Sequence, residues 1–156
     1  MLRQQLGVVM TEEDQGEWTL AEGQIENQPL YMRLRSNLPP ALDKQAFPEN
    51  LVVTWEYESD DSGLPADDLL QRMERLEDLL YAKLADELNQ SHLLVVTTGG
   101  GLRQWLWKTR SAQDAVSMFG EALQGEPQFP IMIEADDDPE WEIYGTYCQQ
   151  CGIEPE

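Results

Sequence analysis

The chain has 156 residues, 41% of them hydrophobic, and its 30 acidic side chains against 10 basic ones give a formal net charge of −20. This length and apolar content suit one domain with its own core and differ from the composition of disordered proteins. A chain with this much negative charge repels phosphate backbones and anionic lipid. No stretch of apolar residues approaches the ~18 that a membrane span needs. We therefore expect a single cytoplasmic domain over residues 1–156 that binds neither nucleic acid nor membranes.

The first part of the chain predicts an arm and a β-hairpin. Residues 1–15 are expected to form a loosely attached arm or a short helix, and their apolar patch at 6–10 is too short to be an export signal. Residues 17–23 and 29–35 alternate apolar and polar side chains, which predicts two strands paired as a hairpin over 16–36. The second strand has two different faces, with Leu30, Met32 and Leu34 on one and Tyr31, Arg33 and Arg35 on the other.

The middle of the chain predicts a strand, a helix and a second hairpin. The stretch 51–58 alternates as a strand, with one face formed by Leu51, Val53, Trp55 and Tyr57. Segment 66–89 is predicted to be one long amphipathic helix, because apolar residues recur three or four positions apart at Leu69, Met73, Leu76, Leu80 and Leu84. Residues 92–98 form an apolar run typical of a strand buried on both faces, and the glycines at 99–101 turn the chain into a strand over 102–108.

The next segment predicts a second helix and a last strand. Ser111 and Asp114 have the spacing of a capping box, which opens a helix that Gly125 ends, and residues 130–134 follow as a short strand. The predicted core-facing residues of this helix are Ala115, Val116, Phe119 and Leu123. The order over 50–134 is then βαββαβ, the pattern of a ferredoxin-like fold. We predict an α+β fold in which the amino-terminal hairpin extends an antiparallel sheet. Two helices should cover one face, and the other should be open or partly covered by the amino-terminal segment.

The acidic segment over 135–156 is the part of the chain best suited to bind a partner. From residue 111 onward the chain has eleven acidic residues and no basic one. Such a patch attracts a basic protein, although it is also compatible with a merely solvated surface. A cation loop is disfavoured because Pro139 and Trp141 interrupt the ligand spacing, so we predict no metal here. The residues predicted to contact a partner are Asp136, Asp137, Asp138, Glu140, Trp141, Glu142 and Tyr144.

Aromatic residues occur at two places where they either pack or bind. Trp141 and Tyr144 would either anchor the acidic segment on the sheet or form the hot spot of an interface, and packing is favoured. The other place consists of two strand faces that combine aromatic residues with arginines, namely Tyr31, Arg33, Arg35, Arg103, Trp105 and Trp107. These faces suit either an RNA-binding platform or a second core, and the net charge favours the core.

No set of residues predicts an enzyme. Cys148 and Cys151 form a CxxC pair, but His92 is the only histidine, so a zinc site of about four ligands lacks partners. We expect reduced thiols, with a disulfide or a metal site as alternatives. The glycines at 99–101 are not followed by the Lys-Ser or Lys-Thr of a phosphate loop and are predicted to be a hairpin turn. We therefore predict no catalytic residue and no cofactor, and keep a small metal- or thiol-dependent enzyme as an alternative.

Three motifs together resemble a known family. They are Leu-Val-Val-Thr-Trp-Glu-Tyr followed by Gly-Leu-Pro, then Thr-Thr-Gly-Gly-Gly-Leu-Arg-Gln-Trp-Leu-Trp, then Asp-Asp-Pro-Glu-Trp-Glu-Ile-Tyr. On these motifs the chain resembles the bacterial "domain of unknown function 695" family over residues 18–147. The matching positions are Trp55, Tyr57, Gly63, Pro65, Thr98, Gly101, Arg103, Asp138, Pro139, Trp141 and Tyr144.

The resemblance implies a binding role. In that family the domain is sometimes fused to one that resembles the regulator of ribonuclease E activity B, an acidic ferredoxin-like inhibitor, and some small acidic members look like immunity proteins encoded beside toxins. No catalytic residues are established for the family, so none carries over. We expect an immunity protein that neutralises a basic toxin such as a nuclease, with a regulator of a cellular ribonuclease as the alternative.

Overall fold

The computed structural model describes residues 7–11, 17–25, 27–38, 42–87 and 89–151. Its strands are β1 (Gly7–Thr11), β2 (Glu17–Ile25), β3 (Gln28–Asn37), β4 (Glu49–Glu56), β5 (Ser91–Gly99), β6 (Leu102–Thr109) and β7 (Ile131–Asp137). Its helices are α1 (Asp67–Leu80), α2 (Ala112–Ala122) and α3 (Glu142–Gln150), with a 3-10 turn η2 (Lys44–Ala46) and a π-helical continuation of α1, η3 (Tyr81–Glu87). The α+β class predicted from the sequence is confirmed.

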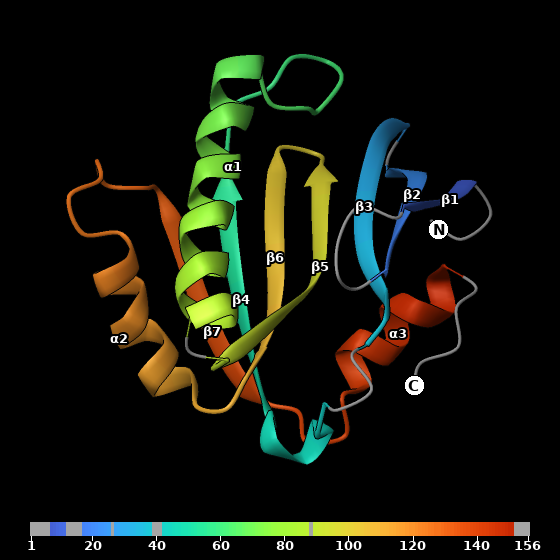
Figure 1. The fold of residues 1–156 in the computed structure, drawn as a ribbon. Helices are drawn as coiled ribbons and strands as arrows, with labels where there is room; N and C mark the ends of the chain where they lie inside the picture. Colours follow the sequence, from blue (N-terminus) through green and yellow to red (C-terminus); the bar gives the residue numbers. More distant parts are fainter. Residues whose placement is uncertain (1–6, 12–16, 26, 39–41, 88, 152–156) are drawn as a thin grey trace.

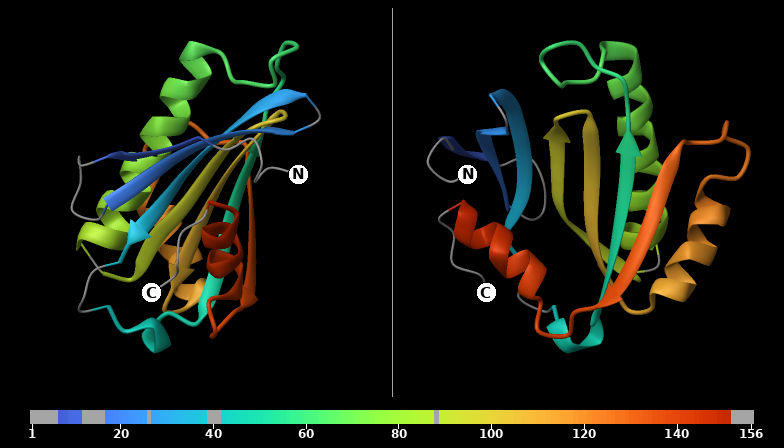
Figure 2. Two further views of the ribbon diagram at one scale, coloured as in Figure 1. Left: turned by 90° about the vertical axis from the view of Figure 1, so that its right-hand side faces the viewer. Right: turned by 180° about the vertical axis from the view of Figure 1, so that it is seen from behind.

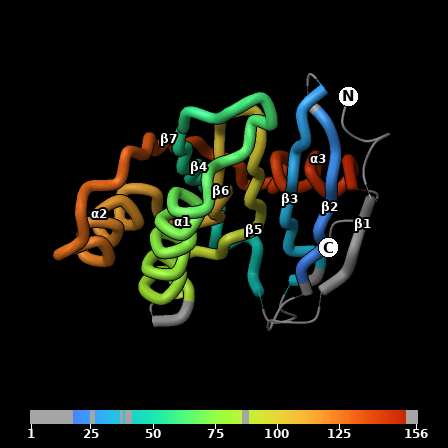
Figure 3. Tube along the Cα trace, turned by 90° about the horizontal axis from the view of Figure 1, so that it is seen from above, coloured from blue at the N-terminus to red at the C-terminus, as the bar shows by residue number. Residues whose placement is uncertain are grey.

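One antiparallel sheet contains all seven of these strands. Their order is β1-β2-β3-β5-β6-β4-β7, so β1 and β7 are the two edges (Figure 1). The views of Figure 2 place α1 and α2 on one face of the sheet, here called the two-helix face, and α3 on the opposite one, here called the α3 face. Figure 3, seen from above, shows the sheet running between these two layers.

The core on the two-helix face follows from the sequence periodicity. Trp55, Trp105 and Trp107 alternate on β4 and β6 and meet the apolar stripe of α1. Helix α2 begins as predicted, because the Ser111 hydroxyl accepts a hydrogen bond from the Asp114 N–H. The prediction for Val116 is wrong: this side chain is 45% exposed, and Ala112, one turn earlier, takes the core position instead.

The core on the α3 face is closed by the carboxyl-terminal helix. Met32, Leu34, Val95 and Leu106 point from the strands to this side and pack with residues of α3 and with Phe47, which follows η2. The sequence suggested that this face is open or covered by the amino-terminal segment. That expectation is corrected, because α3 supplies the cover.

Most strand ends shift by one or two residues from the predictions, and three elements differ in kind or by more. The segment expected as an arm or short helix contains the edge strand β1, while the rest of residues 1–15 lies outside the described residues. The helix predicted over 66–89 is α-helical only as far as Leu80 and then widens into η3. The last strand runs to Asp137 and not only to residue 134, since Asp137 still pairs with Glu49 of β4.

Candidate functional site

The predicted partner-binding residues lie where β7 ends and α3 begins, and they divide into two sets. Asp138, Trp141 and Tyr144 are buried, with 7%, 4% and 1% of their surface exposed. The exposed set is Asp136, Asp137, Glu140 and Glu142. The two sets alternate along a short segment, so the turn between strand and helix decides which side chains reach solvent.

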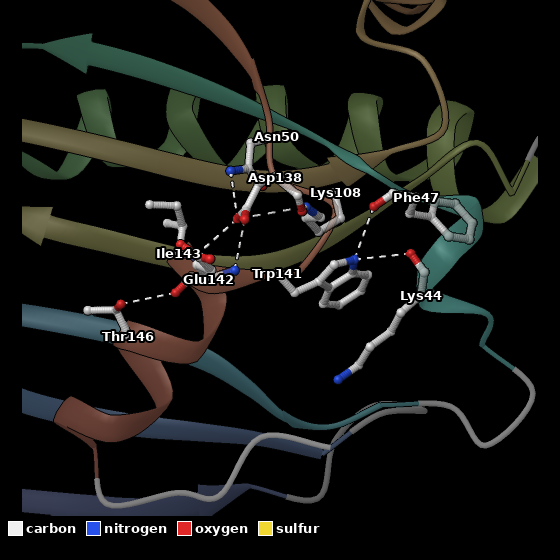
Figure 4. A network of polar contacts seen from close by, with 9 residues as sticks. All are labelled: Lys44, Phe47, Asn50, Lys108, Asp138, Trp141, Glu142, Ile143 and Thr146. Atoms are coloured by element: carbon white, nitrogen blue, oxygen red, sulfur yellow. Dashed lines mark hydrogen bonds and ion pairs between the residues drawn. The ribbon is translucent and has the colours of Figure 1, made fainter.

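Asp138 holds the start of α3 (Figure 4). Its carboxylate accepts hydrogen bonds from the backbone N–H groups of Glu142 and Ile143 at 2.9 and 3.0 Å, and from the Asn50 amide at 3.1 Å. Burial raises the pKa of Asp138, but these three donors and the charge of Lys108 together bring the pKa below its usual value. The carboxylate therefore stays charged and satisfies helix N–H groups that would otherwise lack a partner.

Lys108 is a fully buried cation beneath this turn. Its Nζ donates to the backbone carbonyl of Asp138 at 2.6 Å, while the nearer carboxylate oxygen of Asp138 is 3.9 Å away, so the carbonyl is the closer partner. Burial lowers the pKa of Lys108 more than the neighbouring acidic residues raise it. The ammonium also lies 5.2 Å from the centre of the Trp141 ring, a cation–π distance.

Trp141 connects α3 to the segment before β4. Its indole Nε1 donates to the carbonyls of Lys44 and Phe47, both at 3.1 Å, and the Lys44 ammonium lies 5.3 Å from the ring centre (Figure 4). The backbone of Trp141 has a φ of 61°, which is strained for a bulky side chain. Burial and two hydrogen bonds stabilise this conformation. The positive φ turns the chain from β7 into the helix.

Tyr144 completes the anchor on the α3 face. Its ring packs edge-on against Trp141 with ring centres 5.8 Å apart, and its hydroxyl donates to the backbone carbonyl of Arg35 on β3. Asp138, Trp141 and Tyr144 are thus occupied inside the fold. Their burial leaves little surface for a partner to contact, and the structure supports the packing alternative for the two aromatic residues.

Two of the exposed carboxylates, those of Glu140 and Glu142, line an open pocket beside α3. Its volume is about 420 Å³, and its lining is Lys44, Glu140, Trp141, Glu142, Tyr144, Gly145, Thr146 and Gln149. Among the described residues, no basic side chain forms an ion pair with any of Asp136, Asp137, Glu140 or Glu142. Lys108 lies close enough to feel the charge of Asp136, and Lys44 lines the pocket, but the four carboxylates outnumber these two cations. They are attached to a rigidly held turn, so they can attract cations on another molecule.

The cysteines lie at the other end of α3. Both are free thiols buried in the α3-face core, and the Cys151 Sγ lies 3.6 Å from the Met32 Sδ. Burial raises the pKa of each thiol, which makes the reactive thiolate rarer. Within the described residues, no three His, Cys, Asp or Glu side chains gather in a way that could hold a metal ion.

His92 lies beside the core on the α3 face, against Phe47. Its ring lies 4.7 Å from the ring of Phe47, and within the described part of the chain its Nε2 is buried without a hydrogen-bond partner. Burial, followed by the positive charges of Arg35 and Arg110, lowers the pKa of His92 from 6.5 to about 4. The histidine is therefore neutral at physiological pH.

Two polar centres, one buried and one partly buried, were missed by sequence reasoning. One is Lys108 with Asn50; both occupy the α3 face of their strands, at positions that alternate with apolar residues. The other is Glu77 on α1, which binds Arg33 through both carboxylate oxygens at 2.6 Å and accepts from the Trp105 indole at 3.0 Å. Glu77 directly follows Leu76 of the apolar stripe of α1, and this position was the sequence signal that its carboxylate is partly buried. Of the suggested RNA platform, Trp105 and Trp107 are part of the two-helix core, whereas Tyr31 is exposed.

Comparison with known families places the chain in one of them. Residues 16–148 match DUF695, a family of unknown function. The chain belongs to the DUF695 family. No curated protein matches the chain.

Within the residues that the structure describes, no helix is both long and apolar enough to cross a membrane.

Several motif residues that suggested DUF695 join loops at the other end of the sheet. The Tyr57 hydroxyl donates to the Gly63 carbonyl at 2.7 Å, and the Gly101 N–H donates to the same carbonyl at 3.1 Å. Gly63 has a φ of 75°, and a Cβ there would lie 2.7 Å from the Gln28 amide oxygen. Arg103 donates to the Thr98 hydroxyl at 2.8 Å. These DUF695 motif residues therefore have a structural use that requires no ligand.

Proposed function

We propose that this DUF695 protein binds a basic protein through the exposed carboxylates at the β7–α3 turn, and that it acts as an immunity-type inhibitor of a basic toxin such as a nuclease. An inhibitor of this kind would work in the cytoplasm. The observation that carries the proposal is the set of exposed carboxylates of Asp136, Asp137, Glu140 and Glu142, which form no ion pair with another described residue and lie on a turn held by buried anchors.

Rigidity of the turn supports binding. An interface loses affinity when flexible groups must be ordered on association, and charges fixed beforehand avoid that cost. Asp138 and Trp141 fix the turn from inside, so the carboxylates between and beside them are already placed. A net charge of −20 adds long-range attraction that speeds the encounter with a basic partner and weakens as salt rises.

We also propose that residues 49–137 form a ferredoxin-like unit. The support is the strand order β5-β6-β4-β7, in which β4 and β5 are joined by α1 and β6 and β7 by α2, with both helices on one face. In this arrangement β7 is an edge strand, which leaves the carboxylates at its end open to another molecule.

Affinity capture from the native cell tests the proposed function. The tagged chain is used at low and at moderate salt, and retained proteins are identified by mass spectrometry. We expect one basic protein, encoded beside this chain, whose toxic activity the purified chain inhibits. Recovery of a cellular ribonuclease would instead support the regulator, and a retained set without any basic protein would contradict the proposal.

Charge reversal locates the contact. The double variant Asp137→Lys, Glu140→Lys should weaken binding of the captured protein at least about tenfold, because attraction becomes repulsion at two places. The matched control is Glu58→Lys, Asp61→Lys, which changes the net charge equally at exposed positions beyond the opposite end of β4. Equal weakening by both variants would mean that overall charge, and not this turn, governs binding.

A further inference from the structure

Strand β7 has a free backbone edge. It pairs with β4 on one side, and no other described strand lies on its outer side (Figure 1). The Asp138 N–H donates to the Pro48 carbonyl at 2.8 Å, which makes these two residues a hydrogen-bonded pair that continues the β4–β7 ladder. Such pairs alternate with non-hydrogen-bonded pairs along an antiparallel ladder. Met132, Glu134 and Asp136 therefore bond to β4, while the N–H and C=O groups of Ile133, Ala135 and Asp137 point outward.

The edge lacks three of the usual features that prevent strand addition. Natural edge strands are commonly interrupted by a proline or a β-bulge, or are very short. Strand β7 has seven residues, contains no proline, and pairs with β4 without a shift of register. Its remaining guard is charge, since Glu134, Asp136 and Asp137 are exposed. That guard repels a second copy of β7 but attracts a strand that carries lysine or arginine.

We propose that the free edge of β7 accepts an extended basic segment of the partner protein as an added strand. This inference rests on the proposed function for the partner's charge and specifies how the partner binds. Backbone hydrogen bonds supply affinity in this mode, and alternate side chains supply specificity.

The side chains of β7 define the segment that fits. Met132, Glu134 and Asp136 lie opposite Thr54, Val52 and Asn50 in the ladder, so all three point to the α3 face. Met132 is 55% exposed. The added strand should therefore carry, at alternate positions on that face, two basic residues beside the carboxylates and one apolar residue beside Met132.

Synthetic peptides test the backbone part of the proposal. The probe is a short peptide with two lysines and a valine at alternate positions and threonine between them, titrated against the whole chain by calorimetry. Two further versions are N-methylated, each on one of the two alternate sets of amides. A strand uses only one set to pair with its neighbour. We expect one methylated peptide to bind like the probe and the other to lose at least about tenfold in affinity.

Either of two results overturns the edge proposal. Equal binding of both methylated peptides would mean that charge attraction suffices without strand pairing. Failure of the unmodified probe to bind at low salt would mean that the edge does not accept a basic strand. Neither result touches the proposed function, which depends on capture of a basic protein from the cell.

The chain itself offers a matched pair of variants. Ala135→Pro removes an outward N–H that β4 does not use, so the sheet should fold, as a melting curve and circular dichroism will verify. Ala135→Val keeps the N–H. We expect peptide binding to weaken at least about tenfold in the proline variant and to stay unchanged in the valine variant. Unchanged binding by a folded proline variant would overturn the proposal; if that variant does not fold, the methylated peptides decide alone.

Discussion

Asp137 and Asp138 are neighbours in the chain and the same chemical group, yet they have opposite environments. Asp137 ends β7 and is exposed, while Asp138 is 7% exposed and accepts hydrogen bonds from two helix N–H groups and one amide. Trp141 and its neighbour Glu140 repeat the contrast. One set of side chains builds the turn, and the other set is presented by it. Stability and binding should therefore be separable by substitutions only one residue apart.

Trp141→Ala should have the largest effect on stability. It removes a buried ring, two hydrogen bonds and two cation–π contacts, and we expect the free energy of unfolding to fall by about 4 kcal/mol. Urea unfolding measures this loss, and the exposed neighbour Glu140→Ala is the control, with an expected change within about 0.5 kcal/mol. A loss under about 1 kcal/mol for the tryptophan variant would show that Trp141 is not the anchor.

Asp138→Ala should come next, with a loss of about 3 kcal/mol. The variant removes the helix cap and leaves the buried Lys108 without its carboxylate, although the backbone carbonyl still accepts from Nζ. The neighbouring Asp137→Ala should cost less than about 0.5 kcal/mol. Similar melting temperatures for the two alanine variants would contradict the contrast drawn between these neighbours.

His92 makes the free energy of unfolding depend on pH. Its pKa is about 4 in the fold and 6.5 in the unfolded chain, so between these values the unfolded state binds a proton that the folded state does not. Stability should fall as pH decreases from 6.5 to 4, by about 2 kcal/mol after allowance for partial exposure, and this contribution should be constant below pH 4. His92→Phe keeps a ring against Phe47 and removes the proton site. Parallel pH–stability curves for the two proteins would refute the assignment.

The exposed set should have the smallest effect on stability and the largest on binding. Asp137→Lys, Glu140→Lys should change the free energy of unfolding by less than about 0.5 kcal/mol, because neither side chain makes an ion pair with another described residue. Circular dichroism melts check this value on the same samples used for partner binding. A large loss of stability would mean that these carboxylates also hold the turn.

Local patterns in the sequence predict most elements of the two-helix face. Alternation on β4, the stripe of α1 and the capping box of α2 all depend on residues close in sequence, and each is confirmed. The cover of the α3 face could not be predicted in this way. The segment before α3 is so acidic that it indicates a surface. Its buried partners are distant in sequence: Asp138 contacts Asn50 and Lys108, and Trp141 donates to the carbonyls of Lys44 and Phe47.

The same limit applies to the candidate site. Charge alone identified the acidic segment, but it could not separate the carboxylate that caps a helix from those that face solvent. The turn geometry makes that division, and it depends on Trp141 adopting a positive φ, which no rule for a bulky residue would assign.

The position of α3 as the last described element affects the order of events during synthesis. The strands that place Met32, Leu34 and Leu106 on the α3 face leave the ribosome before the helix that covers them. The two-helix core can form while the chain is still growing, whereas the apolar residues of the α3 face stay exposed to solvent until α3 has emerged. A nascent chain stalled before Trp141 should therefore recruit chaperones, and a chain released after α3 should not.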